Sequence, residues 1–324
     1  MRGRMPSRDT RTAYIYLAPA LIIMAVITFY PLVFQTYISF TDFTSVNVPQ
    51  GAPPPAWVDT QNYERILQGR LGIPNFDFAR IVLFNLWWAL SNVIIHIILG
   101  VGIALLLNIR GLRFKGIYRA LFILPVVIPP IIVATVWQHM FDRDNGAINE
   151  ALKLLGALFK VPPEAFNINW LQQVQDPIPF LPLPLAYFAL LAANTWLGWP
   201  LNSVVATGAL QSIPRELYEA AEMDGAGAWQ KFRNVTLVFL RPAMIPYAIY
   251  GFVITFNLFY LTYFMTGGGP FGRTELLVTQ AYTLVYANRL YGVAAAFGVF
   301  MFFILLAITL FFNRLTKATA SYSD

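Results

Sequence analysis

The chain has 324 residues, of which 57% are hydrophobic and only 12% are charged, and its mean hydropathy is positive. A water-soluble domain could not bury this much apolar surface, so the composition predicts an integral membrane protein. The absence of cysteine excludes disulfides, thiolate metal ligands and cysteine nucleophiles.

Stretches without Lys, Arg, Asp or Glu mark the expected membrane spans, because one such charge at mid-bilayer costs about 2.5 to 3.5 kcal/mol. Each stretch holds the roughly 20 helical residues that cross about 30 Å. They are residues 12–41, 81–109, 120–141, 177–214, 242–272 and 290–313. Lipid offers no partner for backbone N–H and C=O groups, so we expect an all-α membrane protein with six transmembrane helices.

Basic residues orient the predicted spans. Four arginines precede the first span, but its apolar run is longer than that of a signal peptide and lacks an A-x-A-like cleavage site, so we expect a retained anchor. With the amino terminus inside, 14 of the 22 Lys and Arg residues lie in inner segments and 8 in outer loops. We therefore expect a multi-pass protein of the plasma or inner membrane, with both termini cytoplasmic.

The connecting segments do not look like separate domains. The run RGLRFKGIYR, residues 110–119, places four cations in a tight inner loop. We interpret it as an anchor to anionic membrane lipid, and no nucleic-acid partner is expected. The outer loops, residues 42–80 and 142–176, contain the Pro-rich piece GAPPPAW and an amphipathic stretch, NEALKLLGALFK.

Missing motifs narrow the function. The chain has no G-x-x-x-x-G-K-[ST] phosphate loop, no H-E-x-x-H and no G-x-S-x-G, so neither ATP binding by that loop nor hydrolysis is expected of it. No predicted span carries a carboxylate or a fixed cation near its middle, unlike many ion-driven carriers. His96, within the second span, is interpreted as a neutral imidazole bonded to a neighbouring helix. The energy source is expected on another subunit.

A charged block, RELYEAAEMDGAGAWQKFRNVTLVFLRP at residues 215–242, lies between two apolar stretches. The acids Glu216 and Glu219 suit the positive amino end of a helix, and Gly225 suits the left-handed residue that ends one. A second short helix is expected over about residues 227–235. The block predicts a helix–turn–helix knob on the cytoplasmic face.

This block resembles the EAA loop of binding-protein-dependent ABC importer permeases, in Glu219-Ala220-Ala221, Asp224-Gly225-Ala226, Phe232 and Arg241-Pro242. In that family the short coupling helix docks in a cleft on the ATPase subunit, so the resemblance implies a type I importer permease fold. The family usually has Pro where this chain has Val238, which implies a less kinked helix there. The implied ATPase-coupling residues are Glu219, Ala220, Ala221, Asp224 and Gly225.

Further motifs resemble the maltose-type sugar permeases: NTWLGWP at 194–200, FMTGGGP at 264–270 and TELLVTQAY at 274–282. The resemblance implies import of maltose, maltodextrin or a related oligosaccharide, with another solute such as glycerol-3-phosphate as an alternative. It also implies a second related permease, two copies of a cytoplasmic ATPase carrying ATP and Mg, and an external sugar-binding protein. No cofactor or metal is expected on this chain. The best-known maltose permeases carry extra amino-terminal helices and a large external domain after the helix that matches the first span, whereas six spans and a short loop at that point are expected here.

The expected sugar site lies on one face of the fourth span, where residues 194, 197, 198 and 201 fall at i, i+3, i+4 and i+7. An amide, a flat glycine surface and apolar neighbours suit a sugar. The alternative is that Gly198 permits helix contact and Asn194 bonds a neighbouring helix. Family sugar contacts carry over onto Asn194, Leu197 and Gly198, with Leu201 on the same face, and the corresponding fifth-span positions are Gly251, Ile254, Thr255 and Leu258.

The predicted organisation has three parts. Residues 1–80 comprise the cytoplasmic terminus, the first span and an external loop. Residues 81–313 form a five-helix permease core that includes the coupling loop 211–241, and residues 314–324 form a cytoplasmic tail. A self-contained secondary carrier or channel is the alternative that the missing intramembrane charges disfavour, and a membrane-embedded glycosyl-lipid transferase would need a catalytic constellation that is not found.

Overall fold

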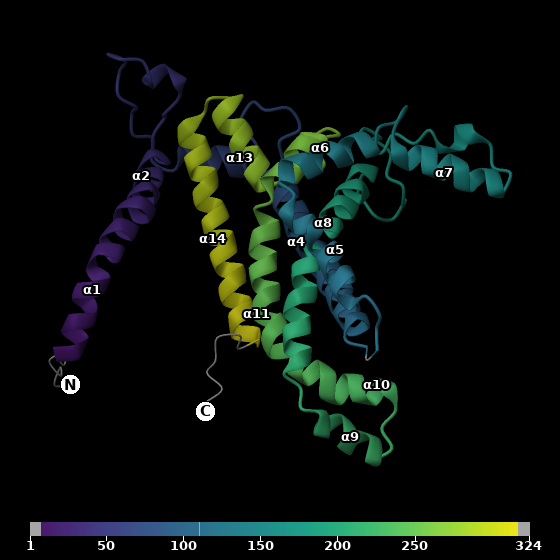
Figure 1. Cartoon of the computed structure of the whole chain (residues 1–324). Helices are drawn as coiled ribbons and strands as arrows, with labels where there is room; N and C mark the ends of the chain where they lie inside the picture. The colour runs from purple at the N-terminus through teal and green to yellow at the C-terminus, as the bar shows by residue number, and fades with distance from the viewer. Residues whose placement is uncertain (1–7, 110, 317–324) are drawn as a thin grey trace. The chain divides into compact units, whose positions relative to one another are not determined.

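The computed structural model describes residues 8–109 and 111–316, and α-helices dominate those ranges (Figure 1). Within them no strand is formed, and one isolated bridge pairs Thr41 with Trp57. The all-α membrane fold expected from the sequence is confirmed. The first residue of the basic run, Arg110, and residues 317–324 of the expected tail lie outside the described residues.

The connections between the helices vary in length, and the longest lie between α2 and α3 and between α7 and α8. They are α1 (Arg8–Met24), α2 (Tyr30–Ile38), α3 (Gln61–Leu67), α4 (Phe78–Leu107), α5 (Lys115–Val127), α6 (Pro130–Met140), α7 (Ala147–Leu158), α8 (Leu185–Gln211), α9 (Arg215–Met223), α10 (Ala228–Lys231), α11 (Leu237–Phe256), α12 (Phe259–Thr266), α13 (Leu277–Tyr286) and α14 (Tyr291–Thr316). Two π-helical turns, Ala25–Phe29 and Phe232–Thr236, join α1 to α2 and α10 to α11.

The chain divides into two compact units, one of residues 1–72 and 281–303 and the other of residues 73–280 and 304–324. In the first unit, the Gln35 amide donates a hydrogen bond of 3.3 Å to the Ala295 carbonyl. The Gly292 N–H donates to the Phe43 carbonyl at 2.8 Å. These bonds connect α2 and the loop after it to α14.

Among the described residues, four helices are long and apolar enough to span a membrane: Arg11–Ile38, Phe78–Leu107, Ala228–Thr266 and Tyr291–Arg314. The pair α5 and α6 adds a fifth candidate that is bent by 95°. The remaining expected span coincides with α8, whose 27 residues extend about 40 Å at about 1.5 Å per residue. The count of six transmembrane helices stays a prediction.

The bend between α5 and α6 corrects the expectation of one continuous helix over 120–141. Ile128 and Pro129 each precede a proline and adopt extended backbone, with ψ of 129° and 132°. A proline ring clashes with the helical conformation of the residue before it, so two prolines in succession break the helix. Pro130 then starts α6 at its first turn, where the missing N–H costs nothing.

The fifth expected span also differs from the prediction. The second short helix of the charged block is not separate, because α10 continues through the π-turn into α11. At the other end α11 stops at Phe256, and Leu258, with ψ of 90°, leaves the helical path before α12 begins. The span is therefore a long helix from Ala228 that is interrupted once.

The second unit is centred on α4 and α8, which stand side by side next to α11 (Figure 1). A buried aromatic and aliphatic cluster joins α4, α8 and α12 near one end, through Trp88, Tyr187, Leu190, Leu261 and Met265. A second cluster joins α4, α8 and α11 near the other end, through Ala104, Ala206, Leu210, Leu240 and Met244. The clusters hold α8 in place at both ends.

A compact turn follows α12. Gly268 has φ of +83°, a conformation that favours glycine, and a Cβ there would overlap the carboxylate of Glu275. Burial raises the pKa of that carboxyl to about 7, against the opposing effects of a Thr279 hydrogen bond and the Arg80 charge. Thr274 Oγ1 closes the turn by donating to the Gly269 carbonyl at 2.5 Å.

A helical knob and a polar helix seam as candidate functional sites

The knob, which we define as residues 215–236, projects from the end of α8 that lies opposite α6 and α7 (Figure 1). Pro214 precedes it with ψ of 137°, so the chain leaves α8 in an extended conformation and restarts as α9 at a new angle. Buried Ile213 packs into the cluster at the end of α4, α8 and α11. The knob is thus attached to the packed end of the bundle.

The end of α9 has the hydrogen bonds of a Schellman motif. The Gly225 N–H donates to the Glu222 carbonyl at 3.0 Å, and the Ala226 N–H donates to the Ala221 carbonyl at 2.9 Å. Gly225 has φ of +76°, and no atom lies within 4 Å of a Cβ built on it. The expectation that α9 ends at this glycine is confirmed, and the requirement for glycine is one of backbone conformation rather than space.

Side chains hold the two arms of the knob together. The Tyr218 hydroxyl and the Thr236 hydroxyl form a 2.9 Å hydrogen bond, and Lys231 Nζ lies 2.6 Å from Glu222 Oε1. The rings of Trp229 and Phe232 stack at 5.4 Å. Thr236 is buried and lies directly before α11. Its hydrogen bond with Tyr218 therefore connects α9 to the start of α11.

The surface of the knob combines acids with large exposed apolar side chains. Glu219, Ala220, Asp224 and Gly225 are exposed and Ala221 is half-buried. Two side chains beside them leave most of their apolar surface uncovered, Met223 at 89% and Trp229 at 70%. Large apolar side chains left exposed on a polar surface are typical of a protein contact site.

The second candidate site is the contact between α4 and α8, which run in the same direction. Six residues spaced four apart meet along it, and we call them the polar seam: Asn92, His96 and Gly100 on α4, with Asn194, Gly198 and Asn202 on α8. Asn194 Nδ2 donates to Asn92 Oδ1 at 2.7 Å, and His96 Nε2 lies 3.0 Å from the Asn194 carbonyl oxygen. The interpretation of His96 as a histidine bonded to a neighbouring helix is confirmed.

Two glycines allow the seam to close. A Cβ on Gly198 would overlap the imidazole ring of His96, and a Cβ on Gly100 would overlap the side chain and backbone of Asn202. Each helix therefore offers a glycine to a larger residue of the other. This exchange brings the helices close enough for side-chain bonds to form between them, as is common in membrane bundles.

The four fourth-span residues expected at a sugar site divide between two sides of α8. Asn194 is only 4% exposed and Gly198 lies against His96, so both face α4. Leu197 packs partly against the aromatic cluster, and Leu201 is 41% exposed. The structure thus gives Asn194 and Gly198 a packing role and leaves the leucines nearer the surface.

The four fifth-span residues are also divided. Gly251 has room for a Cβ, whose nearest neighbour would be Val93 on α4 at 3.9 Å. Thr255 is buried and Ile254 is 50% exposed, so these neighbours point in different directions. Leu258 lies beyond the end of α11. The four residues therefore do not share one helical face.

A cavity of about 570 Å³ opens beside the seam, at the end of α8 near the knob. Its wall combines aliphatic and aromatic side chains with hydroxyls, an amide and one guanidinium, and residues lining it include Arg119, Phe122, Ser203, Val204, Thr207 and Gln211. Among the described residues, no group of three or more His, Asp or Glu side chains could hold a metal ion.

Comparisons with known proteins agree with this architecture. Residues 96–320 match the family described as binding-protein-dependent transport system inner membrane component. The galactooligosaccharides permease GanP of Bacillus subtilis is 30% identical over 313 residues, covering 94% of this chain and 70% of GanP. The trehalose/maltose permease MalF of Thermococcus litoralis is 29% identical over 318 residues, covering 98% of this chain and 97% of that protein.

Solved structures share the fold. A chain from the crystal structure of a bacterial ABC transporter involved in import of the acidic polysaccharide alginate superposes with a TM-score of 0.75 at 19% identity, covering 97% of this chain and 98% of that one. The family match extends over more than half of the sequence and includes the knob and α8. The chain therefore belongs to the binding-protein-dependent transport system inner membrane components, the non-enzymatic permease subunits of ABC importers, whose ATPase is a separate subunit.

Proposed function

We propose that this permease imports an oligosaccharide, with maltose, maltodextrin and related sugars as the first candidates. The observation that carries the ATP-driven part of the proposal is the knob, an exposed helix with an acidic and apolar surface at the end of the bundle opposite α6 and α7. The substrates in the names of the relatives, galactooligosaccharides, trehalose, maltose and maltodextrin, support a neutral sugar.

The proposed assembly contains a second, related permease, two copies of an ATPase that hold ATP and Mg, and an external sugar-binding protein. The solved alginate importer in complex with its substrate-bound periplasmic protein supports the last of these partners. In this arrangement the knob docks on one ATPase copy. Exposed Met223 and Trp229 supply apolar contact area, and Glu219 supplies a carboxylate for a charge-assisted hydrogen bond.

We infer that the sugar passes along α8 and α11. Exposed Leu201 and Ile254, with Leu197 and Leu258, supply apolar contacts for a sugar ring. The remaining members of the predicted set, Asn194, Gly198, Gly251 and Thr255, form the wall behind them, in which Asn194 and Gly198 fix the spacing of α4 and α8. This arrangement keeps all eight residues in the substrate site while assigning direct contact to the exposed ones.

The proposed transport activity is tested by uptake into proteoliposomes that contain this chain with its partner subunits. With binding protein outside and ATP inside, we expect accumulation of radiolabelled maltotriose that stops when ATP is omitted. Galactooligosaccharide and glycerol-3-phosphate, offered in parallel, define the substrate class. Uptake driven by a proton gradient without ATP would instead identify a secondary carrier.

The proposed orientation places the knob in the cytoplasm and the segment between α6 and α8 outside. It is supported by the 14 basic residues of the predicted inner segments against 8 in the outer loops. We expect reporters fused after Arg113 and Lys231 to register as cytoplasmic, and reporters near Gln61 and Lys160 as external. Alkaline phosphatase and green fluorescent protein fusions measure the two locations. An external signal at Lys231 would remove the ATPase from reach of the knob.

A further inference from the structure

The segment between α6 and α8, residues 142–176, contains α7, an amphipathic helix that buries a polar side chain and exposes its apolar face. The buried residues of α7 are Asn149 and Gly156. A helix surrounded by water on its outer side would expose the amide and bury its leucines. From position 151 onward the exposed residues of α7 are instead all apolar: Ala151, Leu154, Leu155, Ala157 and Leu158.

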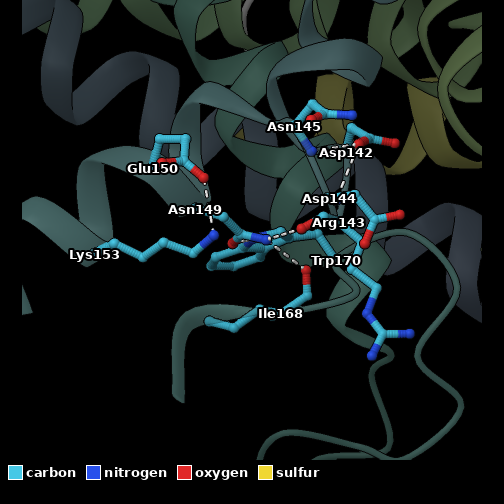
Figure 2. A network of polar contacts seen from close by, with 9 residues as sticks. All are labelled: Asp142, Arg143, Asp144, Asn145, Asn149, Glu150, Lys153, Ile168 and Trp170. Atoms are coloured by element: carbon cyan, nitrogen blue, oxygen red, sulfur yellow. Dashed lines mark hydrogen bonds and ion pairs between the residues drawn. The ribbon is translucent and has the colours of Figure 1, made fainter. Parts of the chain in front are cut away.

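A polar network fixes which face of α7 points outward (Figure 2). Asn149 Nδ2 donates to the Arg143 carbonyl at 2.9 Å and to the Ile168 carbonyl at 3.0 Å, and Asn149 Oδ1 accepts from Trp170 Nε1 at 2.8 Å. Farther along the helix, a Cβ on Gly156 would overlap the Phe166 ring. The helix cannot roll to bury its leucines without breaking these contacts.

The position and direction of α7 differ from those of the long apolar helices. Figure 1 shows α7 beyond α6, at the end of the bundle opposite the knob, running sideways from the bundle rather than along α8. The preceding α6, the second half of the bent span, exposes Ile131, Ile132 and Val136. Exposed apolar side chains therefore occur on α6 as well as on α7, with the exposed polar residues 142–145 between the two helices.

We propose that α7 lies in the headgroup and acyl boundary of the outer leaflet, with its leucine face in lipid. Leu158 and the following Phe159 are 77% and 79% exposed and extend the face past the end of the helix. The face is almost entirely aliphatic, whereas protein contact sites concentrate Tyr, Trp and Arg. Exposed Lys160, directly after it, is placed to reach lipid phosphate. The inference requires that this chain, as a member of its family, is inserted in a membrane. It does not depend on which solute is transported.

The absence of native cysteine allows the proposal to be tested with single labels. Leu154→Cys and Leu158→Cys are labelled with bimane in the assembled importer, reconstituted in phosphatidylcholine and phosphatidylglycerol vesicles. Exposed Glu164→Cys, in the same segment, is the water-facing control. We expect labels at 154 and 158 to be quenched by lipids that carry a shallow nitroxide and to be poorly quenched by iodide in the water. The label at 164 should be quenched by iodide and poorly quenched by the nitroxide lipids. Ala151→Cys repeats the test with a smaller replaced side chain.

Three outcomes would overturn the proposal. Iodide quenching at 154 and 158 equal to that at 164 would place the leucine face in water. Protection from both quenchers that appears only when the external binding protein is added would make the face a protein docking site. Protection from both quenchers without that protein would assign it to a contact with another subunit. Sugar uptake, measured on the same vesicles, reports the proposed function separately.

Discussion

Replacing Gly225 by valine is expected to weaken the contact between the knob and the ATPase, so that sugar-stimulated ATP hydrolysis and sugar uptake fall together. Position 225 has φ of +76°, and a β-branched residue held in a left-handed conformation costs about 1–3 kcal/mol. The two hydrogen bonds that end α9 are then lost or distorted, and the knob loses the shape that presents Glu219. We expect sugar-stimulated ATPase activity and uptake to fall about tenfold or more, measured in proteoliposomes with the permease still inserted.

The matched control is Gly225→Asn, since asparagine tolerates the left-handed region and a Cβ at this position meets nothing within 4 Å. It should retain most of the activity. Glu219→Lys tests the surface instead of the turn, because it reverses a charge that we assign to the ATPase contact. Full sugar-stimulated hydrolysis in both Gly225→Val and Glu219→Lys would show that the knob is not a coupling element.

Placing a leucine at position 198 is expected to abolish uptake, because even its Cβ overlaps the His96 ring. Overpacking at a close helix contact costs about 1–3 kcal/mol for smaller additions, and leucine adds three more carbons. The informative variant is Gly198→Ala combined with His96→Ala. If Gly198 acts through packing, the double variant should transport about as well as His96→Ala alone, since the ring that the new methyl group meets has been removed.

The same series tests the alternative that sugar occupies the space above Gly198. In that case removal of the imidazole would not rescue Gly198→Ala, and uptake would stay low while the α4–α8 contact remained intact. Assembly is checked by co-purification of the ATPase, and basal ATPase activity confirms that each variant is folded. Failure of rescue with normal assembly would move direct sugar contact back to Asn194 and Gly198.

The knob was predictable because its signals are local. A proline, early acids and a glycine define the ends of α9 by backbone rules that need only a few neighbouring residues. The bend at Pro129 and Pro130 is equally local, but a stretch that is long enough and free of charge does not reveal it. The signal is the pair of adjacent prolines, since single prolines at positions 125, 200, 242 and 246 are accommodated inside α5, α8 and α11.

The polar seam could be predicted from the sequence only in part. Asn92, His96 and Gly100 are spaced four apart, so a polar stripe on the second span was visible in the sequence. Its partner was not, because nothing local indicates that α4 and α8 lie side by side with Asn194 opposite Asn92. The same spacing that suggests a sugar-binding face equally suits a helix contact, and three-dimensional proximity distinguishes the two.

The seam also sets an order of events during synthesis. Asn92 and Asn194, joined in the finished protein, are 102 residues apart in sequence. At about 5–20 residues per second, α4 waits roughly 5–20 seconds for its partner to emerge. During that interval Asn92 Nδ2 has a partner on its own helix, the Trp88 carbonyl at 2.7 Å, whereas the interhelical bond of His96 depends on α8. Until α8 is inserted, the His96 imidazole therefore needs another polar partner, which the translocon, water or an earlier helix can supply.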